Sequence, residues 1–495
     1  MRYLLTAEEA KQLDEHAIHT VGFPGLVLME KAAMTLVSVL MEREDRRSGF
    51  LFVCGTGNNG GDGLAAARLM CQQGYHAAVV LIGEAEKLSD DAKTQLALAA
   101  ACDVPVLKAE AIGSPYYDVL VDALFGVGLT RAVTGVYEKI ICAVNETGKR
   151  VYAVDVPSGI HGDDGRVMNV AVRAEVTVTF GTNKRGLVLY PGCAYAGEVI
   201  VGDIGYPRAS YEAIVNPAYY YEPDDLKQIL PWRKPDGHKG SFGRVAVIGG
   251  SESMSGAAFF SAKAAYTVGA GLVKLYSVPE NREILLSGIP EALFACYGSG
   301  DEMDEAALDE AVDWADCVVL GPGMGQSART RAVVSYVIQN CDKPIVLDGD
   351  GLTCCPDELL SGSNLILTPH PKEFAKISGK QIRQLKQDFL NEVRAFSQGN
   401  GCVVVGKDAR TVVSDGNQIY VNVSGNSGMG TGGSGDVLTG IIAGLAAQGS
   451  DCFCAARAGV YVHGLAGDCF CDRFNAYSLT ATGLLDELRE ALRFD

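Results

Sequence analysis

The chain has 495 residues, of which 48% are hydrophobic and 21% charged, a composition that excludes global disorder. At roughly 100–200 residues per domain, this length predicts two or three domains. The formal net charge of −18 counts against nucleic acid or an anionic membrane as a partner, because both need clustered Lys and Arg. We therefore expect any phosphate-bearing ligand to be held by backbone N–H groups and a few local cations.

The N-terminal segment and the cysteines indicate where the protein works. Residues 1–18 carry acidic side chains where a secretory signal has its apolar run, and the apolar stretch 437–447 is too short to span a bilayer. Fifteen cysteines without a signal favour reduced thiols and a cytoplasmic location. One cluster could hold zinc, but its C-x-C spacing in helix-patterned sequence favours packed thiols. It comprises Cys452, Cys454, His463, Cys469 and Cys471.

The first half, residues 1–215, alternates short apolar runs with helical windows. Buried parallel strands are expected at Phe50–Cys54, Ala77–Ile82, Val119–Asp122, Val151–Asp155 and Ala174–Phe180. Helices are expected at 7–19, 26–41, 64–73, 93–101 and 136–147. This alternation predicts an α/β domain with a doubly wound, Rossmann-like sheet.

The second half begins after a stretch rich in Tyr and Pro between residues 206 and 240, and we place the boundary near Tyr221. A second α/β domain is expected over residues 225–495, with a hairpin turning at Asp415–Gly416. Its strands are expected at Val245–Ile248, Val273–Ser277, Cys317–Leu320, Ile345–Asp348, Leu365–Leu367 and Cys402–Val405.

A glycine-rich loop, Gly55–Gly63, follows the first predicted strand of the Rossmann-like domain. Its first glycines satisfy the G-x-G-x-x-G spacing of dinucleotide-binding turns, although a tight turn without a ligand has the same pattern. Asp62 argues against the usual dehydrogenase interpretation, because a carboxylate beside a pyrophosphate would repel it. Side-chain oxygens in this turn suit a cation or a ribose hydroxyl better.

Two aspartates end neighbouring strands of the same predicted sheet. Asp122 precedes a second glycine-rich loop, and Asp155 precedes Val156–Gly159. The carboxyl ends of parallel strands form the ligand crevice, so Asn59, Asp122 and Ser158 could be oxygen ligands of an alkali or alkaline-earth cation. Either aspartate could instead cap a helix. Asp155 is the best-placed carboxylate for proton transfer, because it sits on a rigid strand end.

The segments NNGGDG, DALFGVGLTR and AVDVPSG, in this order, resemble the NAD(P)H-hydrate epimerase family over residues 1–215. The resemblance implies epimerisation of the hydrated forms of NADH and NADPH. It implies potassium ligands at Asn59, Asp122 and Ser158. It implies substrate contacts at Asn58, Asn59, Gly60, Gly61, Asp62, Gly126, Val127, Gly128, Leu129, Thr130, Arg131, Ala132, Tyr137 and Asp155.

The most informative segment of the second half is residues 426–440. Small residues from Gly428 to Gly435 leave backbone N–H groups free at a helix start, which stabilises a transferring phosphoryl group. Asp436, in the first turn, is placed to take a proton from an attacking hydroxyl. G-x-G-D before an apolar helix is typical of ribokinase-like small-molecule kinases. Further loops that fit a nucleotide pocket follow predicted strands at 321–325, 348–350, 368–373 and 407–411.

The segments VAVIGGS, GPGMG, LDGDGL, TPHPKEF and GNSGMGTGGSGDVLTG resemble the ribokinase-like NAD(P)H-hydrate dehydratase family over residues 225–495. The common family form has Gly where this chain has Lys372, and usually Pro and Ala where it has Ser427 and Gly430. The resemblance implies hydrate contacts at Ala257, Gly323, His370 and Asp436. It implies nucleotide contacts at Lys407, Asp408, Ala409, Arg410, Thr411 and Gly435.

We therefore predict a bifunctional repair enzyme with catalytic residues Asp155 and Asp436. One domain interconverts the R and S hydrates of NADH and NADPH with potassium. The other uses magnesium and ADP, or ATP, to phosphorylate the S hydrate and eliminate phosphate; ADP is favoured because the fused arrangement resembles the bacterial type. An acidic surface is compatible with a homo-oligomer. The alternatives are a ribokinase-like small-molecule kinase with a regulatory Rossmann-like domain, and a nucleotide-sensing protein without activity.

Overall fold

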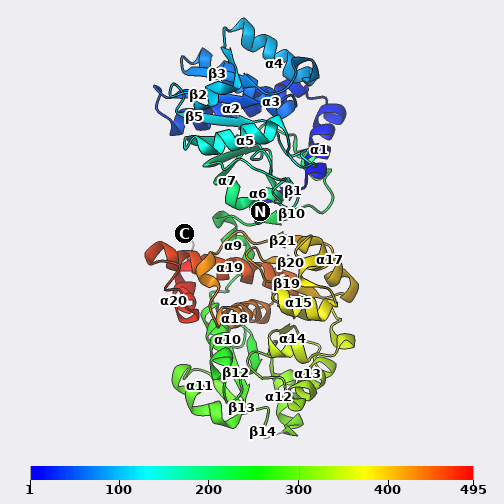
Figure 1. The fold of residues 1–495 in the computed structure, drawn as a ribbon. Coiled ribbons are helices and arrows are strands. Elements are labelled where there is room, and N and C mark those ends of the chain that lie inside the picture. Colours follow the sequence, from blue (N-terminus) through cyan, green and yellow to red (C-terminus); the bar gives the residue numbers. More distant parts are fainter. Residues whose placement is uncertain (1, 300–301, 494–495) are drawn as a thin grey trace. The chain divides into compact units, whose positions relative to one another are not determined.

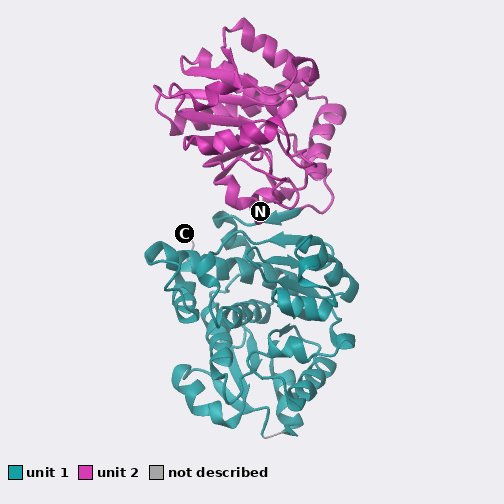
Figure 2. Ribbon diagram, in the orientation of Figure 1, with its two compact units in different colours: residues 1, 218–495 teal, residues 2–217 magenta. Residues whose placement is uncertain are grey.

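The computed structural model describes residues 2–299 and 302–493 (Figure 1). The chain divides into two compact units, an N-terminal unit of residues 2–217 and a C-terminal unit of residues 218–495 (Figure 2). The expected boundary near Tyr221 lies a few residues inside the C-terminal unit. The reason is aromatic packing: the rings of Tyr219 and Tyr221 lie 5.8 and 4.8 Å from the ring of Tyr420.

The N-terminal unit contains a parallel seven-stranded sheet in the order β4-β3-β2-β5-β6-β7-β9. This order reverses direction between β2 and β5, the switch point at which doubly wound sheets bind ligands. The main strands are β2 (Gly49–Cys54), β3 (His76–Leu81), β4 (Val106–Leu107), β5 (Val119–Ala123), β6 (Arg150–Val154), β7 (Val176–Phe180) and β9 (Glu198–Gly202), and β1 (Arg2–Leu5) pairs separately with β8 (Asn183–Lys184). The predicted strands of this half are therefore confirmed to within two residues at either end.

The helices of this unit cover both faces of the sheet. Along β2, Phe50 and Phe52 face a core formed with α2 and α3, whereas Leu51 and Val53 face the core under α5. This alternation follows from the two-residue period of a strand. The helices are α1 (Ala7–Glu15), which a π-type turn (His16–Val21) extends, α2 (Gly25–Arg43), α3 (Asn58–Gln72), α4 (Asp90–Ala101), α5 (Val136–Glu146), α6 (Arg185–Val188), α7 (Cys193–Ala196) and α8 (Arg208–Glu212).

Helix α3 begins at Asn58, so the expectation of a loop through residue 63 is wrong. A Cβ on Gly60 would lie 2.0 Å from the carbonyl oxygen of Gly55, and a Cβ on Gly63 would lie 2.8 Å from Cys54 Sγ. Only glycine lets the first turn lie this close to the strand ends. The segment from Asn58 to Asp62 is therefore a helix N-terminus at the switch point.

The C-terminal unit is built on a sheet in the order β13-β12-β11-β16-β17-β18-β19-β20-β21-β10. Its strands run parallel from β13 to β19, β20 is antiparallel to both β19 and β21, and the hairpin predicted at Asp415–Gly416 is confirmed. The strands are β10 (Ala218–Tyr220), β11 (Arg244–Ile248), β12 (Leu272–Ser277), β13 (Leu293–Cys296), β16 (Cys317–Leu320), β17 (Ile345–Leu347), β18 (Leu365–Leu367), β19 (Val403–Gly406), β20 (Val412–Ser414) and β21 (Ile419–Val421), with a separate pair β14 (Gly298–Ser299) and β15 (Glu302–Met303).

Helix α18 is the central helix of the C-terminal unit: nearly all its residues are buried, and it packs on α10, α19 and β16. Its apolar sequence has no polar face, which suits a helix enclosed on all sides. The helices are α9 (Leu226–Ile229), α10 (Ser255–Thr267), α11 (Arg282–Gly288), α12 (Glu305–Trp314), α13 (Ala328–Asn340), α14 (Asp350–Cys354), α15 (Pro371–Ser378), α16 (Ile382–Leu385), α17 (Phe389–Asn400), α18 (Ser434–Ala447), α19 (Cys452–Arg473) and α20 (Ala481–Ala491). None of the helices in the described part of the chain has the length and apolar character needed to cross a membrane.

Candidate functional sites

Asp122 and Ser158 meet at the switch point of the N-terminal unit. Ser158 donates to the two carboxylate oxygens of Asp122, from its hydroxyl at 2.6 Å and from its backbone N–H at 2.8 Å. The hydroxyl of Ser158 in turn accepts from the N–H of Phe125 at 2.9 Å. Burial raises the pKa of Asp122 to about 6, and the hydrogen bonds from Ser158 oppose that rise. A buried acidic group therefore stands at the ends of β5 and β6.

Asn59 adds a further oxygen donor to this place. A Cβ on Gly126 would lie 3.2 Å from Asn59 Oδ1, so the amide lies against the loop that follows β5. Its Nδ2 atom is buried and has no hydrogen-bond partner. An amide turned over fits the same space and would put its oxygen there. Asn59 thus lies against the loop whose Phe125 N–H bonds to Ser158, and an amide oxygen, a carboxylate and a hydroxyl are ligand types that suit an alkali cation.

Asp155 follows β6 with a backbone φ of +64°, in the left-handed region that a residue with a side chain rarely adopts. Its N–H bonds to the carbonyl of Val178 at 2.8 Å, which ties this conformation to β7. Its Oδ1 atom lies 2.7 Å from Lys184 Nζ, and its Oδ2 atom accepts from the N–H of Val127 at 3.3 Å. The carboxylate therefore lies between a buried lysine and the loop after β5. Strain of this kind is typical of functional positions.

Sequence reasoning missed three residues around Asp155, namely Lys184, Asp14 and Tyr206. Lys184 comes from β8, and Asp14 comes from α1, where the Tyr206 hydroxyl donates to its carboxyl group. Burial and the charge of Asp155 raise the pKa of both Asp14 and Asp62, and Lys184 opposes the rise. The position of Lys184 just after β7 was the only available signal, because Asp14 lies in an ordinary amphipathic helix.

The remaining predicted substrate contacts of this unit lie near the same strand ends. Residues 58–62 form the first turn of α3, and residues 126–132 follow β5. The ring of Tyr137 packs on Phe125 with 4.8 Å between centroids, which places it against this loop. Leu129 is buried in the core under α5 and so attaches the loop of residues 126–132 to that core. Gly128 and residues 130–132 are exposed.

A cavity of about 630 Å³ lies in the C-terminal unit. All four predicted hydrate contacts, Ala257, Gly323, His370 and Asp436, line it. The other lining residues include small residues and two further carboxylates; the full set adds Ser253, Met254, Gly256, Phe260, Gln326, Gly349, Asp350, Thr353, Lys372, Glu373, Lys376 and Gly433. Segments from separate strand ends and from the start of α18 therefore enclose one space.

Asp436 is the third residue of α18. This helix begins directly after Gly433, which has a φ of +87°. Ser261 on α10 fixes the turn by donating to the backbone carbonyl of Asp436 at 3.0 Å. Burial, with the nearby charge of Asp348, raises the pKa of Asp436 to about 7. A carboxyl group with this pKa can take and release a proton near neutral pH.

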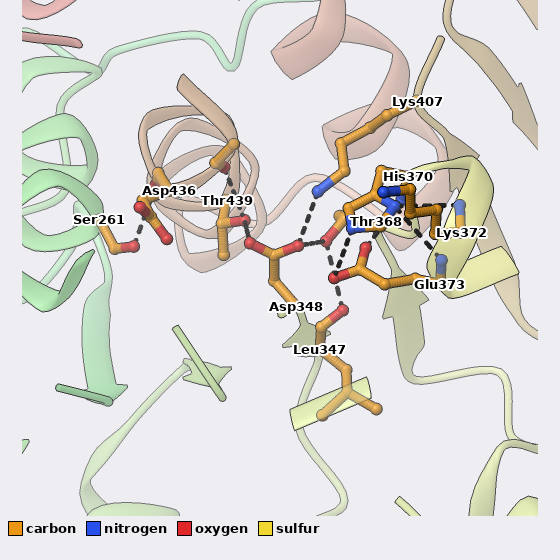
Figure 3. Close-up of polar contacts among 11 residues, drawn as sticks. Ser261, Leu347, Asp348, Thr368, His370, Lys372, Glu373, Lys407, Asp436 and Thr439 are labelled. Carbon is orange, nitrogen blue, oxygen red and sulfur yellow. Dashed lines mark hydrogen bonds and ion pairs between the residues drawn. The ribbon is translucent and has the colours of Figure 1, made fainter. Parts of the chain in front are cut away.

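Asp348 and Lys407 form a buried ion pair next to Asp436, with 2.8 Å between Oδ1 and Nζ (Figure 3). The hydroxyls of Thr368 and Thr439 also donate to Asp348, at 2.7 and 3.1 Å. Burial alone would raise the pKa of Asp348, but Lys407 and the hydroxyls outweigh it and hold the pKa below its usual value. Asp348 is therefore a permanent anion that keeps Lys407 in place.

His370 caps helix α15 and lines the cavity. Figure 3 shows its ring contacts with the first turn of that helix. Its Nδ1 atom accepts from the N–H groups of Lys372 and Glu373 at 3.1 and 3.3 Å, which requires the neutral ring. Burial and the charge of Lys407 lower the pKa of His370, in agreement with that neutral state. Lys372, where this chain departs from the common family form, is exposed at the cavity rim.

The predicted nucleotide contacts divide into two groups. Lys407 Nζ would lie 3.3 Å from a Cβ on Gly435, so the ammonium stands over the N-terminus of α18. Residues 408–411 continue from β19 toward β20, and none of them lines the cavity. The structure thus brings Lys407 and Gly435 together, but neither these two nor residues 408–411 line the cavity.

The cysteine cluster weighed for zinc lies on helix α19, which runs from Cys452 to Arg473. The ring of His463 contacts Ser434 Oγ at 3.3 Å, at the start of α18, and Cys471 contacts Asn426. Within residues 2–299 and 302–493, no group of three or more His, Cys, Asp or Glu side chains is arranged to hold a metal ion. His463 and Cys471 therefore contact the start of α18 and the segment before it, at Ser434 and Asn426.

Comparison with known proteins finds a matching protein family for each half of the chain. Residues 245–490 match the family described as NAD(P)H-hydrate dehydratase, and residues 25–186 match the family described as YjeF-related protein N-terminus. Proteins called bifunctional NAD(P)H-hydrate repair enzyme are similar over nearly the whole chain. The one from Thermofilum pendens is 36% identical, over 98% of this chain and 95% of its own, and the one from Coxiella burnetii is 36% identical over 99% of both. A ribokinase-like protein of Enterococcus faecalis has a similar structure, with a TM-score of 0.51, 28% identity, and coverage of 56% of this chain and 95% of its own.

Proposed function

The chain belongs to the family of bifunctional NAD(P)H-hydrate repair enzymes, and we propose on this basis that it restores hydrated NADH and NADPH in two steps. The N-terminal unit interconverts the R and S hydrates. The C-terminal unit dehydrates the S hydrate at the cost of a nucleoside phosphate. The observation that supports this most is the cavity, because all four expected hydrate contacts line it and a carboxyl group with a pKa of about 7 is among them.

Epimerisation requires the hydroxyl-bearing ring carbon to lose its configuration. In our proposal, Asp155 takes the hydroxyl proton while the carbon–nitrogen bond of the ring breaks, and it returns the proton to the ring nitrogen. The products of this step are an aldehyde and an N–H group, so no atom is gained or lost. Closing the ring by the reverse step gives either epimer. Asp155 suits this role because Oδ2 faces the loop at Val127.

A potassium ion is proposed at Asn59, Asp122 and Ser158. When bound, it supplies positive charge at the switch point of the sheet. The buried, partnerless amide nitrogen of Asn59 and the Asp122–Ser158 hydrogen bonds support this assignment. The residues that gather there have hard oxygen donors, as alkali cations require. Asp122 and Ser158 also hold the loop that carries Phe125, so the cation would stiffen the substrate contacts.

Dehydration is proposed to proceed through a phosphorylated hydrate. Asp436 takes the proton of the ring hydroxyl, whose oxygen forms a bond to the terminal phosphorus of ADP or ATP, and the rest of the nucleotide leaves. The C–O bond to phosphate then breaks, and the neighbouring ring carbon loses a proton. Phosphate is a far better leaving group than hydroxide, which makes this route easier than direct loss of water. Lys407 and the N–H groups at the start of α18 would balance the phosphoryl charge.

The nucleotide and its magnesium are expected beside this cavity. Asp350 and Glu373 line it and offer the oxygen ligands that magnesium prefers. We also propose that ADP is the preferred phosphoryl donor and that residues 408–411 contact the nucleotide. A cytoplasmic location is proposed as well, because all fifteen cysteines are free thiols, the state that a reducing compartment maintains.

The direct test is to incubate the purified protein with NADH hydrate, magnesium and either ADP or ATP, and to follow the return of NADH absorbance. We expect NADH to return only with nucleotide, together with inorganic phosphate. Accumulation of a phosphorylated product without NADH would instead favour the small-molecule kinase. Interconversion of R and S hydrates without nucleotide, resolved by chromatography, tests the epimerase.

A further inference from the structure

Lys184 is a buried lysine in the N-terminal unit whose three N–H donors all have partners. Its Nζ atom lies 2.7 Å from Asp155 Oδ1, 2.8 Å from Thr179 Oγ1 and 2.9 Å from the carbonyl oxygen of Phe180. An ammonium group has three donors and no acceptor. The side chain is therefore fixed in one orientation, and only 4% of the residue is exposed.

The contacts of Lys184 make the two oxygens of Asp155 different. Oδ1 accepts from Lys184 and also from the hydroxyl of Thr179 at 3.0 Å. Oδ2 accepts only the long bond from the N–H of Val127 among the described residues. One oxygen is thus committed to the protein, and the other is directed at the loop of residues 126–132.

The charges around Asp155 give Lys184 a second effect. Burial and the charge of Asp155 raise the pKa of both Asp14 and Asp62, the charge of Asp14 adds to the rise at Asp62, and Lys184 opposes the rise at both. The hydroxyl of Tyr206 donates to Asp14. Lys184, which pairs only with Asp155 among the described residues, therefore offsets part of the repulsion among the three carboxyl groups.

We propose that Lys184 is a positioning residue for epimerisation, which holds Oδ1 of Asp155 so that Oδ2 is presented to the hydrate as the proton acceptor. The proposal rests on the proposed epimerase activity and adds a residue to it. Lys184 transfers no proton in this proposal: the proton moves from the hydroxyl to Asp155 and then to the ring nitrogen. Thr179 assists from the neighbouring strand.

The test compares Lys184→Met with Lys184→Arg in the full-length protein. Methionine keeps the length but removes the charge, whereas arginine can still pair with Asp155. Lys149→Met is the matched control, because the Lys149 ammonium bonds to the carbonyls of Ile112 and Ser114 in the same unit without contact with Asp155. The assay starts from one pure epimer and measures kcat and KM of epimerisation by chromatography.

We expect Lys184→Met to lower kcat about 10- to 100-fold, because small misplacements of a catalytic group have costs of this size. KM should stay within roughly threefold of wild type, since the substrate contacts remain. Lys184→Arg should keep kcat within about tenfold of wild type. Lys149→Met should epimerise normally, and nucleotide-dependent dehydration of the S hydrate should be normal in all three variants.

The proposal is overturned if Lys184→Met keeps kcat within roughly threefold of wild type, or if methionine and arginine lower kcat equally. If Lys184→Met does not fold, Thr179→Val is used, because it removes one hydrogen bond to Oδ1 and leaves the charge. We then expect kcat to fall about 3- to 10-fold at unchanged KM, and an unchanged kcat would refute the proposal. A wild-type protein without epimerase activity would instead refute the proposed function, which separates the two failures.

Discussion

Both units of the molecule place an aspartate–lysine pair, with one partner buried and the other partly buried, at the carboxyl ends of parallel strands, yet the two pairs have different roles. In the N-terminal unit, Asp155 and Lys184 are 2.7 Å apart, and the paired carboxylate is itself the proposed base. In the C-terminal unit, Asp348 and Lys407 are 2.8 Å apart, and the proposed base is the unpaired Asp436 beside them. The same pair thus orients a base in one site and tunes a neighbouring base in the other.

The largest effect that tests this comparison of the two sites is expected at Asp436. Asp436→Asn keeps the shape but cannot accept a proton, so nucleotide-dependent dehydration should fall at least about 100-fold. Epimerisation and nucleotide binding should stay close to wild type. Asp304→Asn is the control, because Asp304 also begins a helix of this unit, α12, and is not part of the cavity wall. Dehydration within a few-fold of wild type in Asp436→Asn would mean that another group is the base.

The counterpart in the N-terminal unit is Asp155→Asn, which should lower epimerisation about 100-fold and leave dehydration of the S hydrate unchanged. An amide cannot accept the hydroxyl proton, although it can still contact Lys184. Asp118→Asn, at a carboxylate that accepts from the N–H of Gly49, is a suitable control. Equal epimerisation by wild type and Asp155→Asn would remove Asp155 from the mechanism.

A smaller effect is expected at the proposed cation site. Asp122→Ala removes a buried carboxylate, so epimerisation should fall about tenfold and no longer respond to added potassium. The measurement is the epimerisation rate against potassium concentration at constant ionic strength. A variant that keeps the wild-type potassium response would refute the assignment of Asn59, Asp122 and Ser158.

The last prediction concerns pH and needs no variant. Because burial raises the pKa of Asp436 to about 7, half of this carboxyl group is protonated near that pH and cannot act as a base. The kcat/KM for dehydration of the S hydrate should therefore reach half its maximum near pH 7 and fall about tenfold for each further unit of acidification. A kcat/KM that is constant down to about pH 5 would contradict the role given to this pKa.

The strands and the order of the two domains could be predicted from the sequence, because buried parallel strands are continuous apolar runs between turns. The start of α3 could not, because Asn and Gly disfavour helices, and only the close approach of Gly60 to Gly55 explains them. His370 and Asp436 were found through strand-end loops and the G-x-G-D pattern.

The residues that sequence reasoning missed are those joined only by tertiary contacts. Asp14 in α1 and Lys184 in β8 lie far apart along the chain, yet Lys184 pairs with Asp155 and the charge of Asp155 acts on Asp14. Lys407 was expected at the nucleotide, but its pairing with Asp348 depends on the register of β17, β18 and β19. A local sequence pattern cannot predict such a contact between residues at the ends of different strands.

The central claim is that one chain holds two separable sites, and mixing the two variants tests it most directly. Asp155→Asn and Asp436→Asn are incubated alone and together with both epimers of NADH hydrate, magnesium and ADP, and NADH absorbance is followed to completion. We predict that Asp155→Asn alone restores the S share and then slows to the uncatalysed rate, and that Asp436→Asn alone restores almost none. The mixture should restore all the NADH at a rate near wild type. A mixture that restores no more than the sum of the two variants would contradict the account.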